Sequence, residues 1–520
     1  MDKHFASHAQ NERKELPMIL PGSKIGALSE PLTGRHWDAG TVINRIASRV
    51  TLFRSLGMGV ADRVLILHGN DLEFFIELLA IWQVGACAIP IDDRLAPYEI
   101  DRIRRAAHPR FATAPASFDG SVVSALSQRG IVMMDAHADG DDGTPDPAPG
   151  MVSLDDAALI LFTSGTTGNP KGVVHTHRSL QARWALLHQC LGERAYRRSL
   201  CVLPTHFGHG LICNCLFPWL QGAELFIAPS FNMEVASTLG RIIDENAISF
   251  LSSVPALWRL VLKVSGPPKG GSLQRIHCGS APLSEDLWRQ IREWGQIDEV
   301  YNSYGITETG SWTAGTSIDG LVPEDGLIGY PWGASIKVCR DATVCADENE
   351  VCGAGEEGYI WLSTPALMKG YLDREDLTRD VVKNGWFTTG DIGLIDERGY
   401  LYLRGRSREE INKGGMKIYP TDVDLVAENS PGVSDVCTFA IHDALYGQDV
   451  GIALVIKGNP KKVVADLKER MRERLARHKI PVRWYLLDEI PRTSRGKTNR
   501  AAVAKICDAN SQFQFLGEPR

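Results

Sequence analysis

The stretch Leu159-Ile-Leu-Phe-Thr163-Ser-Gly-Thr-Thr-Gly-Asn-Pro-Lys171-Gly172 places a loop rich in glycine and hydroxyl groups directly after a short apolar run. The apolar run is typical of a strand, and a second one, Val173-Val174, follows the loop. Glycines let backbone N–H groups approach phosphate oxygens, while the hydroxyls and the lysine add donors and positive charge. A flexible linker is the alternative, but linkers seldom join two apolar strands. The stretch therefore predicts a phosphate-binding loop between two strands.

This loop departs from the Walker A pattern G-x-x-x-x-G-K-[ST] at two positions. When the pattern is counted from Gly165, Pro170 takes the place of the second glycine. Gly172 takes the place of the hydroxyl that binds magnesium. An ordinary P-loop NTPase is therefore disfavoured.

Length and composition indicate a globular protein with more than one domain. The chain has 520 residues, which exceeds the usual size of one core, and its 44% hydrophobic and 23% charged residues are ordinary values. The net charge of −7 does not indicate a protein that binds nucleic acid. No stretch is apolar enough to predict a membrane span. The first residues lack the apolar core of a signal peptide. The 11 cysteines show no C-x-x-C spacing, which predicts reduced thiols, no structural zinc and a cytoplasmic location.

Strand-like and helix-like segments alternate along the first part of the chain. Residues 62–67 and 86–91 are expected to be strands, and Leu72 to Val84 is expected to be an amphipathic helix between them. This succession predicts βαβ units and a largely parallel sheet. The polar run 136–150, rich in Gly, Pro and Asp, is expected to be a surface linker.

The character of the chain changes beyond about residue 320, where glycines and short strands dominate. We expect an α/β fold with a large N-terminal domain of stacked sheets over residues 1–404, which includes a β-rich subdomain over about residues 320–404. Residues 405–520 are expected to form a small, mobile α+β lid domain with a basic helix over Lys461–His478. The charged junction near residues 404–408 is either a hinge or a solvated turn.

Four further motifs place polar groups at probable strand ends or turns. Gly279-Ser-Ala-Pro-Leu-Ser284 follows a strand and begins a helix, where backbone N–H groups can meet a ligand. Tyr301-Asn-Ser-Tyr-Gly-Ile-Thr-Glu308 combines aromatic rings that can stack on a base with a carboxylate that can hold magnesium. Trp386-Phe-Thr-Thr-Gly-Asp391 ends in a carboxylate suited to a ribose diol, and Pro491-Arg-Thr-Ser-Arg-Gly-Lys497 offers a lysine at a turn. Each of these polar residues alone could instead be a cap, a turn residue or a solvated charge.

Together and in this order, the motifs resemble the adenylate-forming (AMP-binding) superfamily of acyl-CoA synthetases, peptide-synthetase adenylation domains and luciferases. The resemblance covers about residues 64–500 and includes Ala80-Ile-Trp-Gln-Val-Gly-Ala, Pro365-Ala-Leu-Met-Lys-Gly-Tyr371 and Arg477-His-Lys-Ile-Pro481. It implies an AMP-forming acid–thiol ligase that uses ATP and Mg²⁺ to activate a small carboxylic acid, releases pyrophosphate, and passes the acyl group to a thiol. The implied thiol is CoA or the phosphopantetheine of a carrier protein.

The resemblance also implies a role for individual residues in binding ATP. The phosphate loop would wrap the β- and γ-phosphates with Thr163, Ser164, Gly165, Thr166, Thr167, Gly168 and Lys171. The adenine slot would be formed by Gly279, Ser280, Ala281, Asn302, Ser303 and Tyr304. The ribose hydroxyls would be held by Asp391 and Arg406. At the reacting end, Thr307 would contact the α-phosphate, Glu308 would help bind Mg²⁺, and Lys497 would bridge the substrate carboxylate and the α-phosphate region.

The small C-terminal domain of such enzymes rotates between the two half-reactions, and two segments match that behaviour. Arg408 stands at the pivot, where relatives usually carry Asp or Lys, so it is the expected hinge residue. Lys413, Gly414 and Gly415 match the loop that lines the thiol tunnel in relatives that form thioesters, where glycines permit close backbone approach. This match favours a thiol acceptor.

The acid itself is only loosely indicated. Leu203-Pro-Thr-His-Phe-Gly-His-Gly210 resembles the loop that gates the acyl pocket, so His206 is the expected gate, although a core histidine is the alternative. His209 stands where relatives often have an aromatic or aliphatic residue, which predicts a more polar pocket than a fatty-acid site. No aspartate lies between Thr205 and Cys215, which disfavours an α-amino acid. The candidate wall residues are Asn214, Ser252, Ser253 and Trp312.

Three functions remain open from the sequence. The first is an acyl-CoA synthetase for a small or medium, polar or aromatic acid. The second is a stand-alone ligase that loads a carrier protein or forms an amide. The third is a catalytically silent homologue, which the intact Lys171, Glu308, Asp391 and Lys497 argue against.

Overall fold

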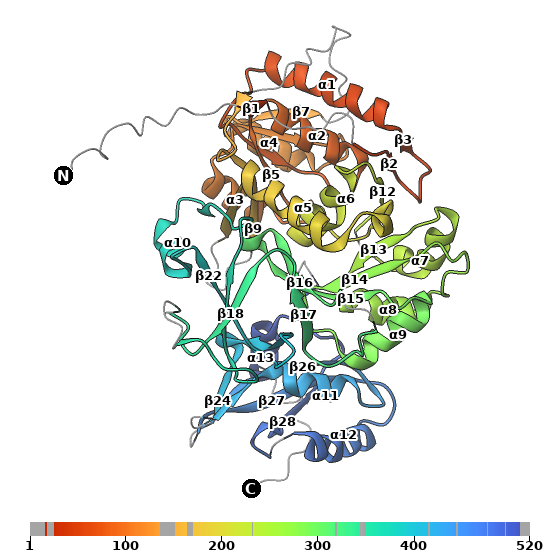
Figure 1. Ribbon diagram of the computed structural model, residues 1–520, viewed down its shortest axis with the longest axis vertical. Helices are drawn as coiled ribbons and strands as arrows, with labels where there is room; N and C mark the ends of the chain where they lie inside the picture. The colour runs from red at the N-terminus through yellow and green to blue at the C-terminus, as the bar shows by residue number, and fades with distance from the viewer. Residues whose placement is uncertain are drawn as a thin grey trace, which may run out of the picture.

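The structure is a computed structural model that describes most of the chain. The described residues are 16–17, 25–135, 151–163, 170–230, 232–317, 320–343, 345, 350–413, 416–443, 446–475, 477–493 and 496–509. The expected surface linker, residues 136–150, lies outside them. Figure 1 shows the first helices and strands at the top, the large sheet across the middle and the C-terminal elements at the base.

A seven-stranded sheet organises the N-terminal part, in the order β20-β10-β9-β5-β4-β6-β7. Its strands are β4 (Arg63–Ile66), β5 (Cys87–Pro90), β6 (Phe111–Ala114), β7 (Val132–Asp135), β9 (Ala157–Thr163), β10 (Lys171–Thr176) and β20 (Gly370–Tyr371). The pairs among β4, β5, β6, β7 and β9 are parallel, which confirms the βαβ expectation. β9 and β10 instead form an antiparallel hairpin with Thr163 opposite Lys171, because a short loop can join only antiparallel neighbours.

Five helices of the described chain accompany this sheet, and α2 packs against β4 and β5. They are α1 (Ala39–Ser55), α2 (Leu72–Gln83), α3 (Pro97–Ala107), α4 (Gly120–Gln128) and α5 (His177–Leu191). The Asp71 side chain accepts a hydrogen bond from the Phe74 N–H and so caps the start of α2. Every residue from Leu72 to Trp82 is buried, because α2 packs in the interior rather than on one face of the molecule. The expected helix is therefore confirmed over Leu72–Gln83, but the expectation that it is amphipathic is wrong.

A larger sheet of 14 strands runs through the middle of the molecule, in the order β18-β19-β22-β23-β17-β16-β15-β14-β13-β11-β12-β2-β3, with β21 paired to β22. Its strands are β2 (Leu28–Ser29), β3 (His36–Trp37), β11 (Arg198–Cys201), β12 (Glu224–Ile227), β13 (Phe250–Ser253), β14 (Arg275–Gly279), β15 (Val300–Ile306), β16 (Ser311–Gly315), β17 (Leu327–Pro331), β18 (Ser335–Cys339), β19 (Gly358–Ser363), β21 (Val382–Lys383), β22 (Trp386–Ile395) and β23 (Leu401–Arg406). The run from β2 to β15 is parallel. The remaining strands are antiparallel and include the glycine-rich region beyond residue 320.

Helices cover both faces of the parallel part. They are α6 (Phe217–Trp219), α7 (Met233–Glu245), α8 (Pro255–Val264) and α9 (Glu285–Gly295), together with the π-helical turn η2 (His209–Leu216), and α10 (Glu375–Val381) lies farther along the chain. Short 3₁₀ turns are η1 (Arg194–Tyr196), η3 (Thr307–Thr309), η5 (Ser407–Glu409) and η6 (Arg477–Lys479), and β1 (Leu16–Pro17) pairs with β8 (Met151–Val152). The helices α7, α8 and α9 bury a core of their own against one face, while η2 lies over the other.

The C-terminal part is an α+β unit with separate hydrophobic clusters. Its five strands are β24 (Ile411–Lys413), β25 (Met416–Ile418), β26 (Val433–Asp443), β27 (Gly447–Ile456) and β28 (Arg483–Leu486). Its helices are α11 (Pro420–Glu428), α12 (Pro460–Arg474) and α13 (Arg500–Ala509). The basic helix expected to reach His478 ends at Arg474, because Leu475 adopts an extended conformation. The boundary expected near residue 404 stays a prediction, since β23 continues to Arg406.

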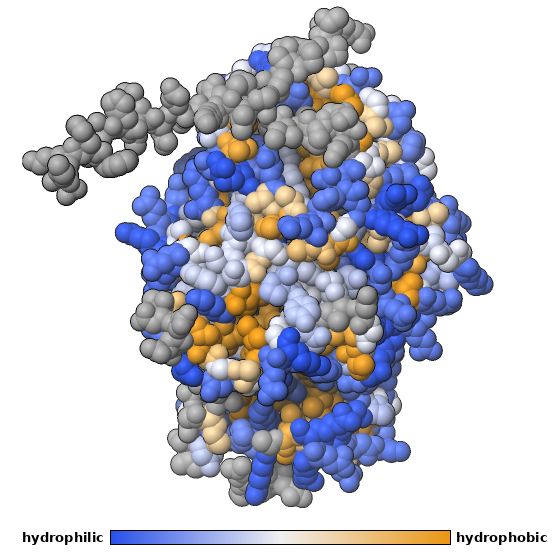
Figure 2. All heavy atoms as spheres, in the orientation of Figure 1, coloured by the Kyte–Doolittle hydropathy of each residue, from blue (hydrophilic) through white to orange (hydrophobic). Residues whose placement is uncertain are grey.

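The distribution of apolar residues can be compared with the expectation that no stretch spans a membrane. Figure 2 shows hydrophilic residues over most of the visible face, with apolar residues gathered in patches in its lower half. Among the described residues, no helix is both long and apolar enough to cross a membrane.

Cys339 and Cys345 form a disulfide, so the expectation of reduced thiols is wrong for this pair. The chain turns back after β18 and brings their Cα atoms to 6.0 Å, a separation that a disulfide spans.

Candidate active site

Several of the predicted site residues lie at the carboxyl ends of the parallel strands. Gly279 ends β14, and Ile306 ends β15 immediately before the turn η3, which carries Thr307 and Glu308. In open α/β sheets, ligands bind in the crevice outside this edge because the loops diverge there. We refer to this side of the large sheet as the carboxyl edge.

Asp391 and Arg406 form the most strongly paired part of the site. They are opposite each other on β22 and β23, and Arg406 Nε lies 3.0 Å from Asp391 Oδ1. The Tyr304 hydroxyl donates to Asp391 Oδ2 at 2.7 Å. The negative charge of Asp391 raises the pKa of Arg406, and burial together with Asp391 raises the pKa of Tyr304 well above its usual value. Asp391 is therefore a buried carboxylate whose two oxygens are each held by one partner.

Glu308, Tyr371 and Lys171 form a second group. The Tyr371 hydroxyl donates to Glu308 Oε1 at 2.8 Å, and Lys171 Nζ lies 5.6 Å from the centroid of the Tyr371 ring. The pairing of β10 with β20, with Val173 opposite Tyr371, brings these residues together. The magnesium candidate and the phosphate-loop lysine thus meet across one aromatic ring.

Two buried basic residues that the sequence did not indicate hold the turn η3. His175 Nε2 hydrogen-bonds the Thr307 carbonyl oxygen at 2.8 Å, and Arg183 Nη2 donates to the Thr309 carbonyl oxygen at 2.9 Å. Burial, helped by the charge of Arg183, lowers the pKa of His175 to about 4. A neutral His175 therefore donates its Nε2–H to Thr307. No motif could reveal these contacts, because both partners are backbone carbonyl groups.

Two of the residues expected to form the adenine slot point in different directions: Asn302 toward the Leu327 carbonyl group and Ser280 toward His209. A Cβ added at Gly279 would lie 2.4 Å from the Ser303 carbonyl oxygen, so only glycine fits that strand end. The Asn302 side chain donates to the Leu327 carbonyl oxygen at 2.8 Å and points into the sheet. The half-buried Ser280, with φ of 66°, turns its hydroxyl to His209 Nδ1 at 2.8 Å, and Ala281 follows it.

His209 and Lys497 link the N-terminal and C-terminal parts at this edge. Burial, together with the positive charge of Lys497, lowers the pKa of His209 to about 3. The same packing brings Arg259 of α8 within 2.7 Å of Glu428 of α11. The C-terminal part therefore contacts α8 through this ion pair, and the charge of Lys497 acts on a residue at the carboxyl edge.

Other predicted residues have the following places. His206 is buried, with its Nε2 3.6 Å from Asp92 Oδ2, and its role as a gate stays a prediction. Lys413 is buried in the C-terminal unit, where its Nζ lies 2.5 Å from Asp449 Oδ1. Arg408 lies in η5. The predicted residues Ser164, Gly165, Thr166, Thr167, Gly168, Gly414 and Gly415 lie outside the described residues.

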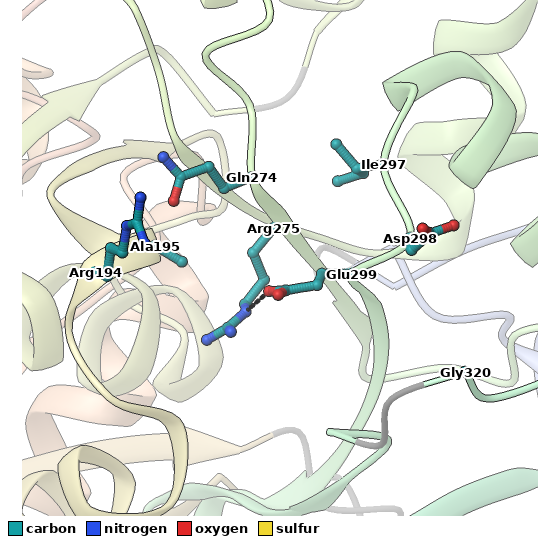
Figure 3. Close-up of a pocket in the computed structure, with 8 residues that line it drawn as sticks. All are labelled: Arg194, Ala195, Gln274, Arg275, Ile297, Asp298, Glu299 and Gly320. Atoms are coloured by element: carbon teal, nitrogen blue, oxygen red, sulfur yellow. Dashed lines mark hydrogen bonds and ion pairs between the residues drawn. The ribbon is translucent and has the colours of Figure 1, made fainter.

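A surface pocket of about 570 Å³ lies at the opposite, amino-terminal edge of the parallel strands. Arg275, the first residue of β14, and Glu299, which precedes β15, line it, and Figure 3 shows their side chains paired. Arg275 Nε donates to Glu299 Oε2 at 2.7 Å. None of the predicted site residues lines this pocket, so its size alone does not mark the site.

Comparison with known proteins identifies the class. Residues 40–372 match the AMP-binding enzyme family, and residues 422–497 match the AMP-binding enzyme C-terminal domain. The chain therefore belongs to the AMP-binding enzyme family. This membership confirms the expected superfamily and the expected α/β fold class.

Individual relatives narrow the class to ligases. The chain is 30% identical over 501 residues to the long-chain-fatty-acid–CoA ligase FadD13 of Mycobacterium tuberculosis, covering 91% of this chain and 94% of that protein. It is 28% identical over 507 residues to the oxalate–CoA ligase of Arabidopsis thaliana, covering 94% and 96%. The o-succinylbenzoate CoA synthetase of Bacillus subtilis, solved with an acyl-adenylate intermediate, superposes with a TM-score of 0.82 at 24% identity, covering 97% and 100%. The expected enzyme class, an AMP-forming acid–thiol ligase, is confirmed, while the acids named for these relatives differ widely.

Proposed function

We propose that this protein activates a carboxylic acid with ATP, releases pyrophosphate, and transfers the acyl group from the adenylate to the thiol of CoA. The position of Lys497 carries the proposal, because its charge acts on His209 at the carboxyl edge although it belongs to the C-terminal unit. The CoA ligases among the relatives support the choice of CoA as acceptor.

The charges at the carboxyl edge suit this chemistry. A carboxylate and a triphosphate repel each other, so attack on the α-phosphorus needs positive charge beside both groups. Lys497 would supply that charge at the reacting end, and Lys171 would hold the departing pyrophosphate. In the first step a carboxylate oxygen bonds to the α-phosphorus. The bond between the α-phosphorus and the bridging oxygen breaks at the same time, and pyrophosphate leaves with that oxygen. In the second step the thiol sulfur bonds to the carbonyl carbon, AMP leaves, and the thiol proton passes to solvent.

Asp391 is suited to the ribose hydroxyls. Each of its carboxylate oxygens has one protein partner, Arg406 or Tyr304, and an ionised carboxylate oxygen can accept a second hydrogen bond. Because those partners fix the orientation of the carboxylate, the diol would meet acceptors that need no rearrangement.

Glu308 fits a magnesium ion. Its carboxylate accepts the Tyr371 hydroxyl, lies in a half-buried turn and keeps lone pairs for a hard cation. Among the described residues, no group of three or more His, Cys, Asp or Glu side chains could hold a metal, and one carboxylate with phosphate oxygens is a usual donor set for Mg²⁺. The ion would neutralise charge on the phosphates.

A panel of carboxylic acids tests the proposal. The purified protein is supplied with ATP and Mg²⁺, pyrophosphate release is measured for each acid, and the acyl acceptor is then varied between CoA and phosphopantetheinylated carrier proteins. We expect release that depends on the acid, followed by an acyl-CoA product. Transfer to a carrier protein alone would overturn CoA as acceptor, and the absence of acid-dependent release across the panel would overturn the function.

A further inference from the structure

We propose that Ser280, positioned by His209, makes this enzyme selective for a short carboxylic acid that carries a second acceptor oxygen, such as an oxo group or another carboxylate. The inference rests on the function proposed above, and it names the class of acid. It starts from the face of the large sheet that lies toward η2.

Strand alternation places a row of polar side chains on that face. Ser252, on β13, hydrogen-bonds His209 of η2 through its hydroxyl at 2.7 Å. Its neighbour Ser253 turns to the other face, where its hydroxyl donates to the His277 carbonyl oxygen and accepts from Trp258 Nε1, so this candidate wall residue does not face His209. Adjacent residues of one strand thus belong to different environments, because successive side chains alternate between the faces. Only the Ser252 face continues to His209.

The hydrogen bonds of His209 fix the direction in which its protons point. The Ser252 hydroxyl is fully buried, and its acceptor among the described residues is His209 Nε2. Ser252 therefore donates to Nε2, and the proton of the neutral imidazole must sit on Nδ1. Nδ1–H in turn donates to Ser280 Oγ at 2.8 Å. The hydroxyl hydrogen of the half-buried Ser280 is then directed away from His209 and into the site.

Two further donors on the same side lack partners within the described part of the chain. Ser303 Oγ and Trp312 Nε1 are both buried without a hydrogen bond, and Ser303 is paired with Gly279, the residue before Ser280. An indole N–H can only donate, and a hydroxyl can donate as well as accept. Leaving such groups unpaired in the interior is unfavourable, so an acceptor supplied by a ligand would stabilise them. With Lys497 nearby, the donors favour an oxygen that is neutral or negatively charged.

Aromatic rings close the space beneath His209. The Trp312 ring centroid lies 5.6 Å from that of His209 and 4.3 Å from that of His277, and Phe250 packs against both Trp312 and His277. These rings are no more than 1% exposed, and close-packed interiors accept extra methylene groups only with strain. A long alkyl chain would meet these rings, whereas a short acid would reach Ser280 without displacing them.

Matched acids and variants test the inference. The acids are 2-oxo-, 3-oxo- and 4-oxopentanoate, with pentanoate as the methylene counterpart and decanoate as the long chain, and kcat/KM for pyrophosphate release is measured for each. The variants are Ser280→Gly, which suits the positive φ, and His209→Phe, which keeps a ring but removes both hydrogen bonds. His209→Asn retains an amide donor near the position of Nδ1, and Ser253→Ala removes a buried hydroxyl from the opposite face as a control.

The ratio of kcat/KM for the best oxo acid to that for pentanoate is the deciding quantity. We expect at least about a tenfold ratio for the wild-type protein, as one hydrogen bond to a buried donor gives, and a decanoate value below that of pentanoate. Ser280→Gly and His209→Phe should lower the ratio to about one, His209→Asn should restore part of it, and Ser253→Ala should leave it unchanged. Thermal unfolding of each variant reports loss of fold separately.

Three results would overturn the inference: a wild-type preference for pentanoate or decanoate, an equal fall for both acids in His209→Phe and Ser280→Gly, or an equal change of the ratio in Ser253→Ala. Failure of the wild-type protein to release pyrophosphate with every acid would instead overturn the proposed function, so the two failures are distinguishable.

Discussion

The two edges of the large sheet each carry an arginine, a carboxylate and a tyrosine, but the carboxylate is half exposed at one edge and buried at the other. At the amino-terminal edge, Arg275 bonds Glu299, the Leu191 carbonyl oxygen and the Tyr196 hydroxyl, and 47% of the Glu299 side chain is exposed. At the carboxyl edge, Asp391 is 4% exposed and holds one partner on each oxygen.

This difference teaches that a hollow does not by itself mark a site. The pocket beside Arg275 is lined by groups whose partners come from the protein and from solvent. The carboxyl edge instead combines a buried carboxylate with the charge of Lys497 and buried donors such as Trp312 Nε1, which has no partner in the described part of the chain. Buried polar groups favour a ligand because they are costly to leave unpaired.

Removing the cation at the carboxyl edge should give the largest effect. We expect Lys497→Ala to slow acyl-adenylate formation by about 100- to 1,000-fold, because the charge that offsets two anions in the transition state is lost. Thioester formation from preformed adenylate should stay within a few-fold, since that step does not join two anions. Single-turnover assays of each half-reaction measure the two rates.

The exposed Lys505 of α13 provides the control for this substitution. Lys505→Ala removes a like charge from the same unit and should change neither half-reaction. Equal losses in both half-reactions of Lys497→Ala would show that the lysine stabilises the docked domain rather than the reacting groups.

The arginine–carboxylate pairs at the two edges can be compared directly. Asp391→Asn removes a charge that would accept the ribose hydroxyls, so we expect the KM for ATP to rise about 10- to 100-fold, as for loss of hydrogen bonds to a charged group. Glu299→Gln removes the matching charge at the amino-terminal edge and should leave KM unchanged, with a stability loss below about 1 kcal/mol because the pair is partly exposed. Steady-state kinetics and urea unfolding measure both. Similar KM changes in the two variants would remove the distinction between the edges.

Acid should lower the free energy of unfolding through protonation of His175, which holds the turn η3. The pKa of this histidine is about 4 in the folded chain against 6.5 for the free residue, so between these values the unfolded chain binds more protons. The free energy of unfolding should therefore fall as the pH falls from about 6.5 to about 4, by ~1.4 kcal/mol per pH unit for this residue. Urea unfolding at several pH values measures the slope, and His175→Gln should reduce it. An unchanged slope in that variant would show that other groups control the acid sensitivity.

The local part of the site could be predicted from the sequence. The elements β4, α2, β5 and the hairpin around the phosphate loop follow from short apolar runs, and Glu308, Asp391 and Lys497 each end a recognisable motif. The contacts of His175 and Arg183 could not be predicted, because they join a strand and a helix to backbone carbonyl groups of a distant turn. Strand alternation predicts that Ser252 and Ser253 point to opposite faces, but which of them meets His209 was hidden, because the packing of η2 on the sheet decides it.

The sequence by itself determined the class of chemistry. A phosphate loop that lacks the Walker hydroxyl, a carboxylate after β15 and a lysine near the C-terminus are fixed by local residue order, and local order is enough to identify the family. Only the tertiary structure decided which of these groups meet and which hydroxyls remain unpaired. The reason is that these residues interact with partners far away in the chain: Asp391 with Arg406, and Ser280 with His209. The charge of Lys497 likewise acts on His209.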